Sequence, residues 1–200
     1  AEEGEGLDGE KVSRAAAVIL EETQRLTEIV NVFIQSARPQ GPILEKHSVN
    51  RVCEDVIRVM ESECDQSGVT LRADLDPDLP LILLDIHLMF QALRNLVRNA
   101  LEAHQEAMKQ VSAASETTPP ESKDPPTIFV RTRLSAGAVT IDVVDNGPGI
   151  PEDKLDKIFE PYFSTKFDGT GLGLMVVYRV VTEHQGLIHV DSRPGLGTRF

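Results

Sequence analysis

The positions of the hydrophobic residues separate a long N-terminal helical segment from a series of shorter segments. Between residues 12 and 37, apolar side chains recur at alternating steps of four and three residues, the a/d pattern of helical bundles, with Thr23 as the one interruption. Additional apolar residues widen this face. The segment is long and ends abruptly at residues 38–42, which favours a bundle between chains over a core helix of its own domain. The seam consists of Val12, Ala16, Ile19, Thr23, Leu26, Val30, Phe33 and Ala37.

After residue 42, stretches with helical periodicity alternate with strand-like stretches, which predicts an α/β fold. Ser48 is a candidate N-cap, and Gly68 ends the helix that follows it. Residues 112–126 are rich in Ser, Thr and Pro with almost no apolar content, so we expect a flexible loop. The expected helices span residues 48–66, 86–108, 151–159 and 172–184. The expected strands span residues 69–75, 81–85, 127–134, 138–145, 187–192 and 197–200.

Composition narrows the classes of function. The 200 residues include 20 Lys+Arg and 32 Asp+Glu, a net charge of −12, which argues against a general binder of nucleic acid or membrane surfaces but leaves room for one local anion pocket. Aromatic residues make up only 4% and Trp is absent, so the core must be mostly aliphatic. The length suits one domain of about 150 residues with an appendage, or two small domains.

We expect a reducing, cytoplasmic setting, because the sequence shows no targeting signal and its two cysteines are not placed to pair. No apolar run reaches the roughly 18–20 residues that span a bilayer, and the acidic first ten residues lack the features of a secretory signal. Cys53 and Cys64 fall on one expected helix, about 16 Å apart, which is too far for a disulfide. We expect two unpaired thiols.

Three segments carry candidate chemistry. On the helix expected at 86–108, Gln91, Asn95, Asn99 and Glu102 form one polar row, which is either an exposed face or a source of amide ligands for Mg²⁺. The sequence DNGPGI (145–150) follows an apolar strand. Its carboxylate, Asp145, can accept a hydrogen bond from an exocyclic amine, and its glycines let a flat base approach, although a plain tight turn explains the same residues.

The third segment, GTGLGL (169–174), leads into a helix, where backbone N–H groups bind phosphate. Its spacing differs from the dinucleotide fingerprint and from a Walker A loop, and the chain has no protein Ser/Thr kinase motifs. Between the two glycine clusters, residues 158–166 combine aromatic anchors with a lysine, as expected of a mobile lid over phosphate.

Taken together, four motifs resemble the ATP-binding domain of sensor histidine kinases, within the superfamily of gyrase, heat-shock chaperone and mismatch-repair ATPases. They are NLVRNALEA (95–103), DNGPGI (145–150), FEPYFSTK (159–166) and GTGLGL (169–174), and SRPGLGTRF (192–200) resembles the last glycine segment of the family. Residues 33–39 resemble the second dimerisation helix of nitrogen-regulation-type kinases. The resemblance implies a two-layer sandwich, a mixed β-sheet covered on one face by helices (the Bergerat-type ATP-binding fold), over residues 41–200. Residues 1–40 would end a dimerisation domain.

The resemblance also implies roles for individual residues. Asn99 would hold Mg²⁺ with Asn95 assisting, Asp145 would read the adenine amine, and Lys166 would approach the terminal phosphate. Arg98 is a phosphate contact on chemical grounds only. The implied ATP site consists of Asn95, Arg98, Asn99, Asp145, Gly147, Gly149, Ile150, Phe159, Phe163, Lys166, Gly169, Thr170, Gly171, Leu172, Gly173, Leu174 and Thr198.

One position distinguishes the subclasses. ATP hydrolases of the superfamily have a glutamate general base where this chain has Asn95, and an amide cannot take a proton at neutral pH. The site should therefore hold ATP·Mg²⁺ and transfer the γ-phosphoryl group to a histidine, for relay to an aspartate of a response regulator. The phospho-accepting motif of the family is absent, and we assign structural roles to all five histidines. We therefore expect a piece of a longer kinase that does not phosphorylate itself.

Other functions stay open. A superfamily ATPase is disfavoured by Asn95, and a Ser-directed kinase of the same fold by the helix expected at 12–37. A nucleotide-sensing dimerisation module without catalysis is disfavoured by the intact motifs. The expected partners are a second copy, through the N-terminal helix, and a receiver domain, with neither nucleic acid nor a membrane contacted by this segment. This expectation concerns the present segment only and is compatible with a membrane anchor elsewhere in the longer protein.

Overall fold

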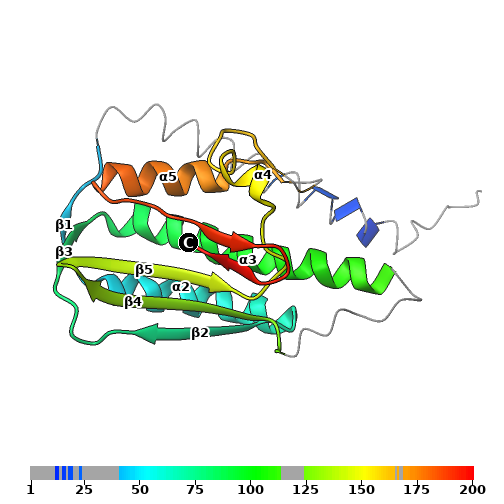
Figure 1. Cartoon of the computed structure of the whole chain (residues 1–200), viewed down its shortest axis with the longest axis horizontal. Helices are drawn as coiled ribbons and strands as arrows, with labels where there is room; N and C mark the ends of the chain where they lie inside the picture. Colours follow the sequence, from blue (N-terminus) through cyan, green and yellow to red (C-terminus); the bar gives the residue numbers. More distant parts are fainter. Residues whose placement is uncertain are drawn as a thin grey trace, which may run out of the picture.

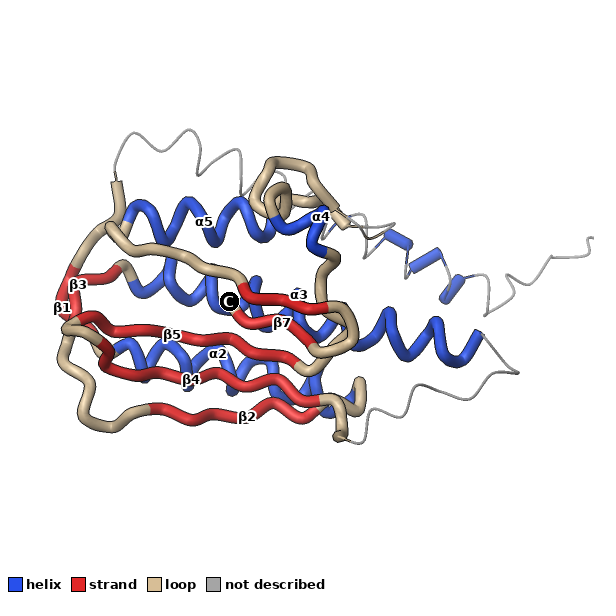
Figure 2. Tube along the Cα trace, viewed as in Figure 1, coloured by secondary structure: helices blue, strands red, loops and turns tan. Residues whose placement is uncertain are grey.

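Two layers make up the described part of the chain, a β-sheet and a set of helices that cover one of its faces (Figures 1 and 2). The computed structural model describes residues 41–113, 124–164, 166 and 169–200, together with residues 12, 13, 15, 16, 18, 19 and 23. The helices are α2 (Val49–Gln66), α3 (Ile86–Ala113), α4 (Glu152–Leu155) and α5 (Gly173–Glu183). The strands are β1 (Glu45–His47), β2 (Thr70–Leu75), β3 (Ile82–Leu84), β4 (Thr127–Ser135), β5 (Ala138–Asp145), β6 (Asp191–Arg193) and β7 (Gly197–Arg199).

The main sheet is mixed, as expected. Its strand order is β2-β4-β5-β7-β6, with β2 parallel to β4 and the other neighbours antiparallel. A two-residue turn joins β4 to β5, with φ of 50° at Ala136 and 81° at Gly137, and two positive φ values match the twist of a hairpin. The last strand in the sequence, β7, therefore lies inside the sheet between β5 and β6.

The core lies between this sheet and helices α2, α3 and α5, and it is aliphatic, as the composition predicts. The buried stripe of α2 runs from Val49 to Cys64, and Leu101 of α3 and Ile128 of β4 are almost completely buried. The expected absence of a disulfide is confirmed, since Cys53 and Cys64 are free and buried. Burial, with help from neighbouring acidic residues, raises the pKa of Cys53 to about 12 and that of Cys64 to about 11, so both thiols stay protonated.

Most expected elements are present, and two helix ends differ. Ser48 precedes α2 in an extended conformation, but its side chain makes no capping hydrogen bond. Helix α3 continues to Ala113, beyond the expected end at residue 108, because residues 105–110 still contain strong helix formers. Residues 112 and 113 of the expected loop are thus helical, and residues 114–123 lie outside the described part. Helix α4 ends at Leu155, after which the chain turns.

One strand prediction needs correction, and one strand was not predicted. Residues 187–190, expected to begin a strand, join no ladder in the described structure, and Leu187 is 86% exposed, so only residues 191–193 form β6. The pattern also did not predict β1, whose three residues have no apolar alternation. It pairs antiparallel with β3 in a separate two-stranded sheet.

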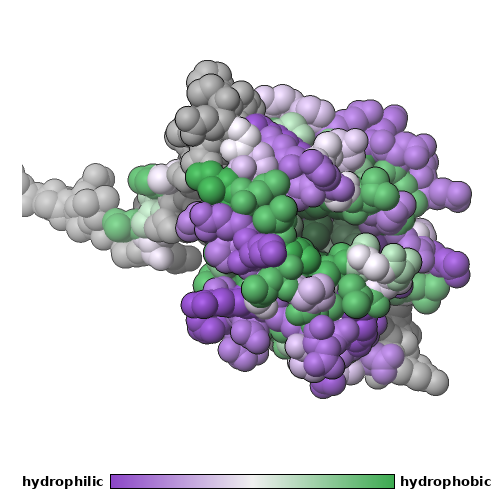
Figure 3. Space-filling model, turned by 90° about the vertical axis from the view of Figure 1, so that its left-hand side faces the viewer, coloured by the Kyte–Doolittle hydropathy of each residue, from purple (hydrophilic) through white to green (hydrophobic). Residues whose placement is uncertain are grey.

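That small sheet lies at the end of the molecule where residue 41 enters, and apolar surface gathers there. Figure 3 views this end and shows hydrophobic surface around a hollow. Exposed apolar side chains on the nearby segments include Ile43, Leu81, Leu83 and Leu187.

Most of the helix expected over residues 12–37 lies outside the described part. The seven described residues between 12 and 23 are helical and exposed. Packing of this helix between two copies of the chain therefore stays a prediction. Among the described helices, none combines the length and the apolar character needed to cross a membrane.

Candidate functional site

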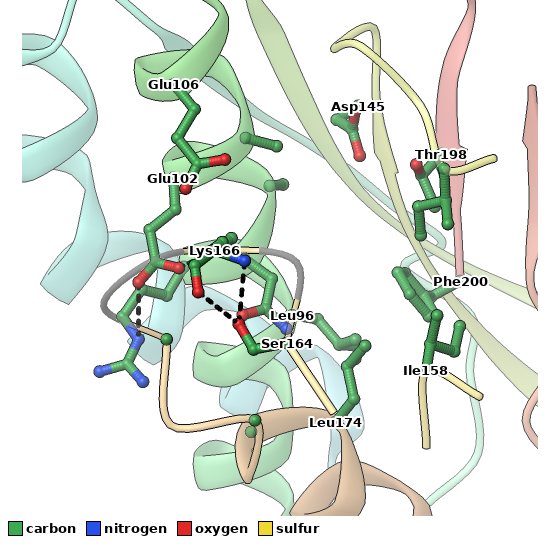
Figure 4. Close-up of a pocket in the computed structure, with 18 of the residues that line it drawn as sticks. Leu96, Glu102, Glu106, Asp145, Ile158, Ser164, Lys166, Leu174, Thr198 and Phe200 are labelled. Atoms are coloured by element: carbon green, nitrogen blue, oxygen red, sulfur yellow. Dashed lines mark hydrogen bonds and ion pairs between the residues drawn. The ribbon is translucent and has the colours of Figure 1, made fainter. Parts of the chain in front are cut away.

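A pocket opens between α3, the end of β5, the loop from α4 to α5, and β7 (Figure 4). Most of the residues expected in the site line it. Those that do are Arg98, Asn99, Asp145, Gly149, Ile150, Phe163, Lys166, Gly169, Thr170, Gly171, Gly173, Leu174 and Thr198. Those that do not are Asn95, Gly147, Phe159 and Leu172. The polar row of α3 is thus not a plain exposed face.

Asp145, the last residue of β5, is 9% exposed at one side of the pocket. Burial raises the pKa of its carboxyl group, although the backbone N–H groups of Gly147 and Thr198 oppose the shift by donating to it. The Gly147 N–H lies 2.8 Å from Asp145 Oδ1, and a Cβ at Gly147 would lie just as close to that oxygen. Gly147 therefore fixes the carboxylate from behind, without lining the pocket.

The turn after Asp145 is fastened to the β6–β7 hairpin. Gly149 has φ of +71°, and a Cβ there would lie 2.1 Å from the carbonyl oxygen of Arg193, so only glycine fits. Ile150 N–H donates to Ser192 Oγ at 2.7 Å. Thr198 stands opposite Asp145 in the β5–β7 register, and its hydroxyl lies 2.9 Å from Ser192 Oγ. These contacts bring Asp145, Ile150 and Thr198 to one end of the pocket.

The two asparagines of α3 take different positions. Asn99 lines the pocket, and its amide lies 3.8–3.9 Å from the point where a Cβ of Gly173 would be. Asn95 is 7% exposed, and its Nδ2 donates to the carbonyl of Gly173 at 3.3 Å. Asn95 therefore ties α3 to the first turn of α5, one layer behind the pocket surface.

Contacts within the loop between α4 and α5 hold its described residues. Lys166 N–H donates to Ser164 Oγ at 3.0 Å, and Tyr162 N–H donates to the carbonyl of Gly171 at 3.1 Å. Gly171, at φ +65°, has no room for a Cβ, which would lie 2.4 Å from the Tyr162 carbonyl carbon. Phe159 packs its ring against Tyr178 and Phe200 with centroids 5.6 and 6.4 Å apart, so it anchors the loop from outside the pocket.

Sequence reasoning missed several lining residues, among them Glu102, Glu106, Ser164 and Phe200. Glu102 was placed in the polar row of α3 but given no role. Its carboxylate forms an ion pair with Lys166. The spacing from Asn99 to Glu102 and Glu106, three and seven residues, places all three on one helix face and is the signal that could have indicated them.

None of the five histidines lines the pocket. His104 is 5% exposed, and its Nε2 has no hydrogen-bond partner within the described structure. Burial lowers the pKa of His104, against an opposing effect of the Thr127 carbonyl, so the ring is neutral at pH 7. The ring of His184 bridges Val180 O and Asp85 N–H, at 2.7 and 2.9 Å. Both rings serve packing and hydrogen bonding within the fold.

Comparison with known proteins identifies the family. Residues 84–200 match the family described as histidine kinase-, DNA gyrase B-, and HSP90-like ATPase. The chain belongs to this ATPase family. Sporulation kinase E of Bacillus subtilis is 34% identical over 184 residues, which make up 92% of this chain and 22% of that protein. The sensory histidine kinase/phosphatase NtrB of Klebsiella oxytoca is 35% identical over 178 residues, 89% of this chain and 48% of that protein.

Solved structures agree with the fold of this family member. The catalytic domain of histidine kinase ThkA is 27% identical with a TM-score of 0.62, over 78% of this chain and 92% of that one. Full-length ShkA, solved in complex with AMPPNP, has a TM-score of 0.75 at 23% identity, over 98% of this chain and 38% of that one. The expected two-layer fold is confirmed. The chain spans between a fifth and a half of the length of the two curated relatives named above.

Family membership supports ATP as the ligand of this pocket. The donor set also fits a divalent metal held mainly by phosphates. No cluster of three or more His, Cys, Asp or Glu side chains among the described residues could cage a metal by itself. Mg²⁺ usually takes few protein ligands beside nucleotide phosphates, and the amide of Asn99 is one suitable ligand in the pocket.

Proposed function

We propose that this chain is the catalytic part of a two-component sensor histidine kinase. It binds ATP with Mg²⁺ and transfers the γ-phosphoryl group to a histidine outside this segment, for relay to an aspartate of a response regulator. The observation that carries the proposal is the presence of an asparagine, Asn95, in place of a general base. This residue stands where ATP hydrolases of the superfamily have their general base, and its buried amide donates to Gly173 O.

The other carboxylates in the pocket do not replace that base. Among the described lining residues they are Asp145, Glu102 and Glu106. Asp145 is held by Gly147 and Thr198 at the end of the pocket that we assign to adenine. Glu102 and Glu106 lie seven and eleven residues beyond Asn95 on α3, about 10 and 16 Å along the helix, so neither takes its place. The pocket is therefore better suited to holding ATP until a histidine imidazole arrives than to activating water for hydrolysis.

Residue roles follow from this assignment. The carboxylate of Asp145 accepts a hydrogen bond from the adenine amine, with Thr198 beside it. Backbone N–H groups between Gly169 and Gly173, at the start of α5, bind the phosphates. Asn99 is the protein ligand of Mg²⁺, which offsets negative charge on the transferring group. Arg98 and Lys166 contact phosphate oxygens.

The organisation of the chain and its partners belongs to the same proposal. Residues 1–40 end a helical dimerisation domain, and residues 41–200 form the ATP-binding domain. The partners are a second copy of the chain and a receiver domain. A response regulator is the partner in the solved complex of ThkA with TrrA, whose kinase chain has this fold at 23% identity and a TM-score of 0.72. A site that uses ATP and a receiver domain belongs in the cytoplasm.

The test follows the γ-phosphate. The chain is mixed with Mg²⁺, γ-labelled ATP and a dimerisation domain that carries the phospho-accepting histidine, and labelled protein is separated from free phosphate. We expect acid-labile label on the added domain and little free phosphate. Asn99→Ala is the loss variant, and it should abolish the label because Mg²⁺ loses its protein ligand. Steady phosphate release without labelled protein would instead assign the chain to the ATP hydrolases.

A further inference from the structure

Both basic side chains in the described lining of the pocket face the same carboxylate. Lys166 Nζ forms an ion pair with Glu102 Oε2, and Arg98 Nε lies 3.5 Å from Glu102 Oε1 (Figure 4). Arg98 and Glu102 are one turn apart on α3, whereas Lys166 comes from the loop that precedes α5. One carboxylate thus links two cations from different parts of the fold.

This arrangement lies in a partly desolvated place. The side chains of Lys166, Arg98 and Glu102 are 22%, 28% and 36% exposed. Ion pairs that are partly removed from water are screened less than fully exposed pairs. Breaking such a pair therefore has a larger effect on the affinity for a charged ligand. The described lining also carries more acidic than basic side chains. The acidic ones are Glu102, Glu106 and Asp145, and the basic ones are Arg98 and Lys166.

A nucleotide's phosphates need the same donors. The cationic groups of Lys166 and Arg98 that pair with Glu102 are those that would contact phosphate oxygens under the proposed function. A phosphate that takes them leaves Glu102 without its partners and facing another anion. Like charges at short distance in a half-buried site oppose binding. The opposition concerns the phosphates and not the base, since Asp145 and Thr198 lie on the other side of the pocket (Figure 4).

We propose that Glu102 sets the affinity of the pocket for nucleotides by competing with their phosphates for Lys166 and Arg98. This inference rests on the proposed function, and it assigns to Glu102 a role that the family resemblance did not give it. Glu102 keeps both cations in place in the empty pocket. Binding of a di- or triphosphate then requires an exchange of partners, whereas binding of adenosine does not.

The test removes the charge of Glu102 and keeps its shape. Dissociation constants of adenosine, ADP and ATP are measured by calorimetry on the whole chain, first in EDTA and then with Mg²⁺. Glu102→Gln should tighten ADP and ATP in EDTA by about two- to fivefold, the upper part of the range for one partly exposed ion pair. Its affinity for adenosine should stay unchanged, which also shows that the variant is folded.

Two comparisons make the test specific. Glu106→Gln removes the same charge from the same lining, one turn further along α3, and should tighten ATP by less than about twofold, since a distant charge acts only through screened Coulomb repulsion. Lys166→Met should weaken ATP binding more in the Glu102→Gln background than in the wild type. A lysine without a competing carboxylate gives its full interaction to phosphate.

Four outcomes would overturn the inference. Equal tightening by Glu102→Gln and Glu106→Gln would mean a general effect of charge. If Glu102→Gln bound ATP more weakly than the wild type in Mg²⁺ but not in EDTA, Glu102 would be a ligand of the metal. Wild-type binding of ATP with no change in Glu102→Gln would refute the competition while leaving the proposed function in place. Failure of the wild type to bind any adenine nucleotide would refute both together.

Discussion

Asp145 is the single residue whose environment most directly ties stability to binding. Its carboxylate is buried at the end of β5, and burial raises its pKa. A carboxyl group with a raised pKa stabilises the folded state below the pKa of the unfolded chain, and that contribution is lost as the pH rises through the folded value. The ionised carboxylate that would bind adenine therefore opposes folding at neutral pH.

Asp145→Asn should accordingly abolish most ATP affinity without lowering the melting temperature at pH 7. In the wild type, ATP affinity should fall on acidification, beginning above the ordinary Asp pKa of about 3.9, because protonation removes the acceptor for the adenine amine. Calorimetric titrations across the acidic range check this. Asp142→Asn, on the same strand but paired with Arg199, is the control and should retain ATP binding. Unchanged affinity in Asp145→Asn would contradict the adenine assignment.

At the scale of elements, Asp85 fastens the beginning of α3 to two other segments. Its Oδ1 accepts the N–H groups of His87 and Leu88 at 3.0 and 3.1 Å, as an N-cap does, and its Oδ2 accepts Ile43 N–H at 3.1 Å. Its own N–H donates to His184, at the end of α5. Burial opposes ionisation of Asp85, but the three donors outweigh it and lower its pKa.

Asp85→Ala should destabilise the chain by about 1–2 kcal/mol at pH 7, the usual cost of a lost N-cap. Because the pKa of Asp85 is lowered in the folded state, its contribution is present above the unfolded pKa and is lost as the pH falls through the folded value. Urea unfolding at pH 7 and near pH 3 measures both effects, and the difference between variant and wild type should shrink at the lower pH. A difference that stays constant across this range would mean that the carboxylate contributes no charge-dependent stability.

The limits of sequence prediction also belong to this scale. Strong local periodicity predicted α2, β4 and β5, because the spacing of apolar residues within a single helix or strand depends only on neighbouring residues in the sequence. The three-residue β1 has no such pattern, and neither has the parallel pairing of β2 with β4, which joins segments more than 50 residues apart. The contact of Glu102 with Lys166 spans 64 residues and depends on how the fold closes. Most of the pocket was predicted because its motifs are contiguous.

At the scale of the whole molecule, the contacts within 41–200 suggest a self-contained unit. The core lies between one sheet and three helices, all within residues 41–200. Every described residue that lines the pocket also lies within this range. A chain of residues 41–200 should therefore fold and bind ATP with an affinity within about twofold of the 200-residue chain, as expected of an independent domain. Only the longer chain should have the mass of a dimer in light scattering. Loss of ATP binding in the shorter chain would refute the domain boundary.

The position of β7 makes the site depend on closure of the sheet. Gly197–Arg199 follow β6 in the sequence, yet they insert between β5 and β6 and bring Thr198 beside Asp145. Helix α3 and the β4–β5 hairpin contain no residue of β7. The base end of the pocket does, because Thr198 forms one of its walls. Nucleotide can therefore recognise only a chain in which β7 has taken its place in the sheet, and its binding reports that closure.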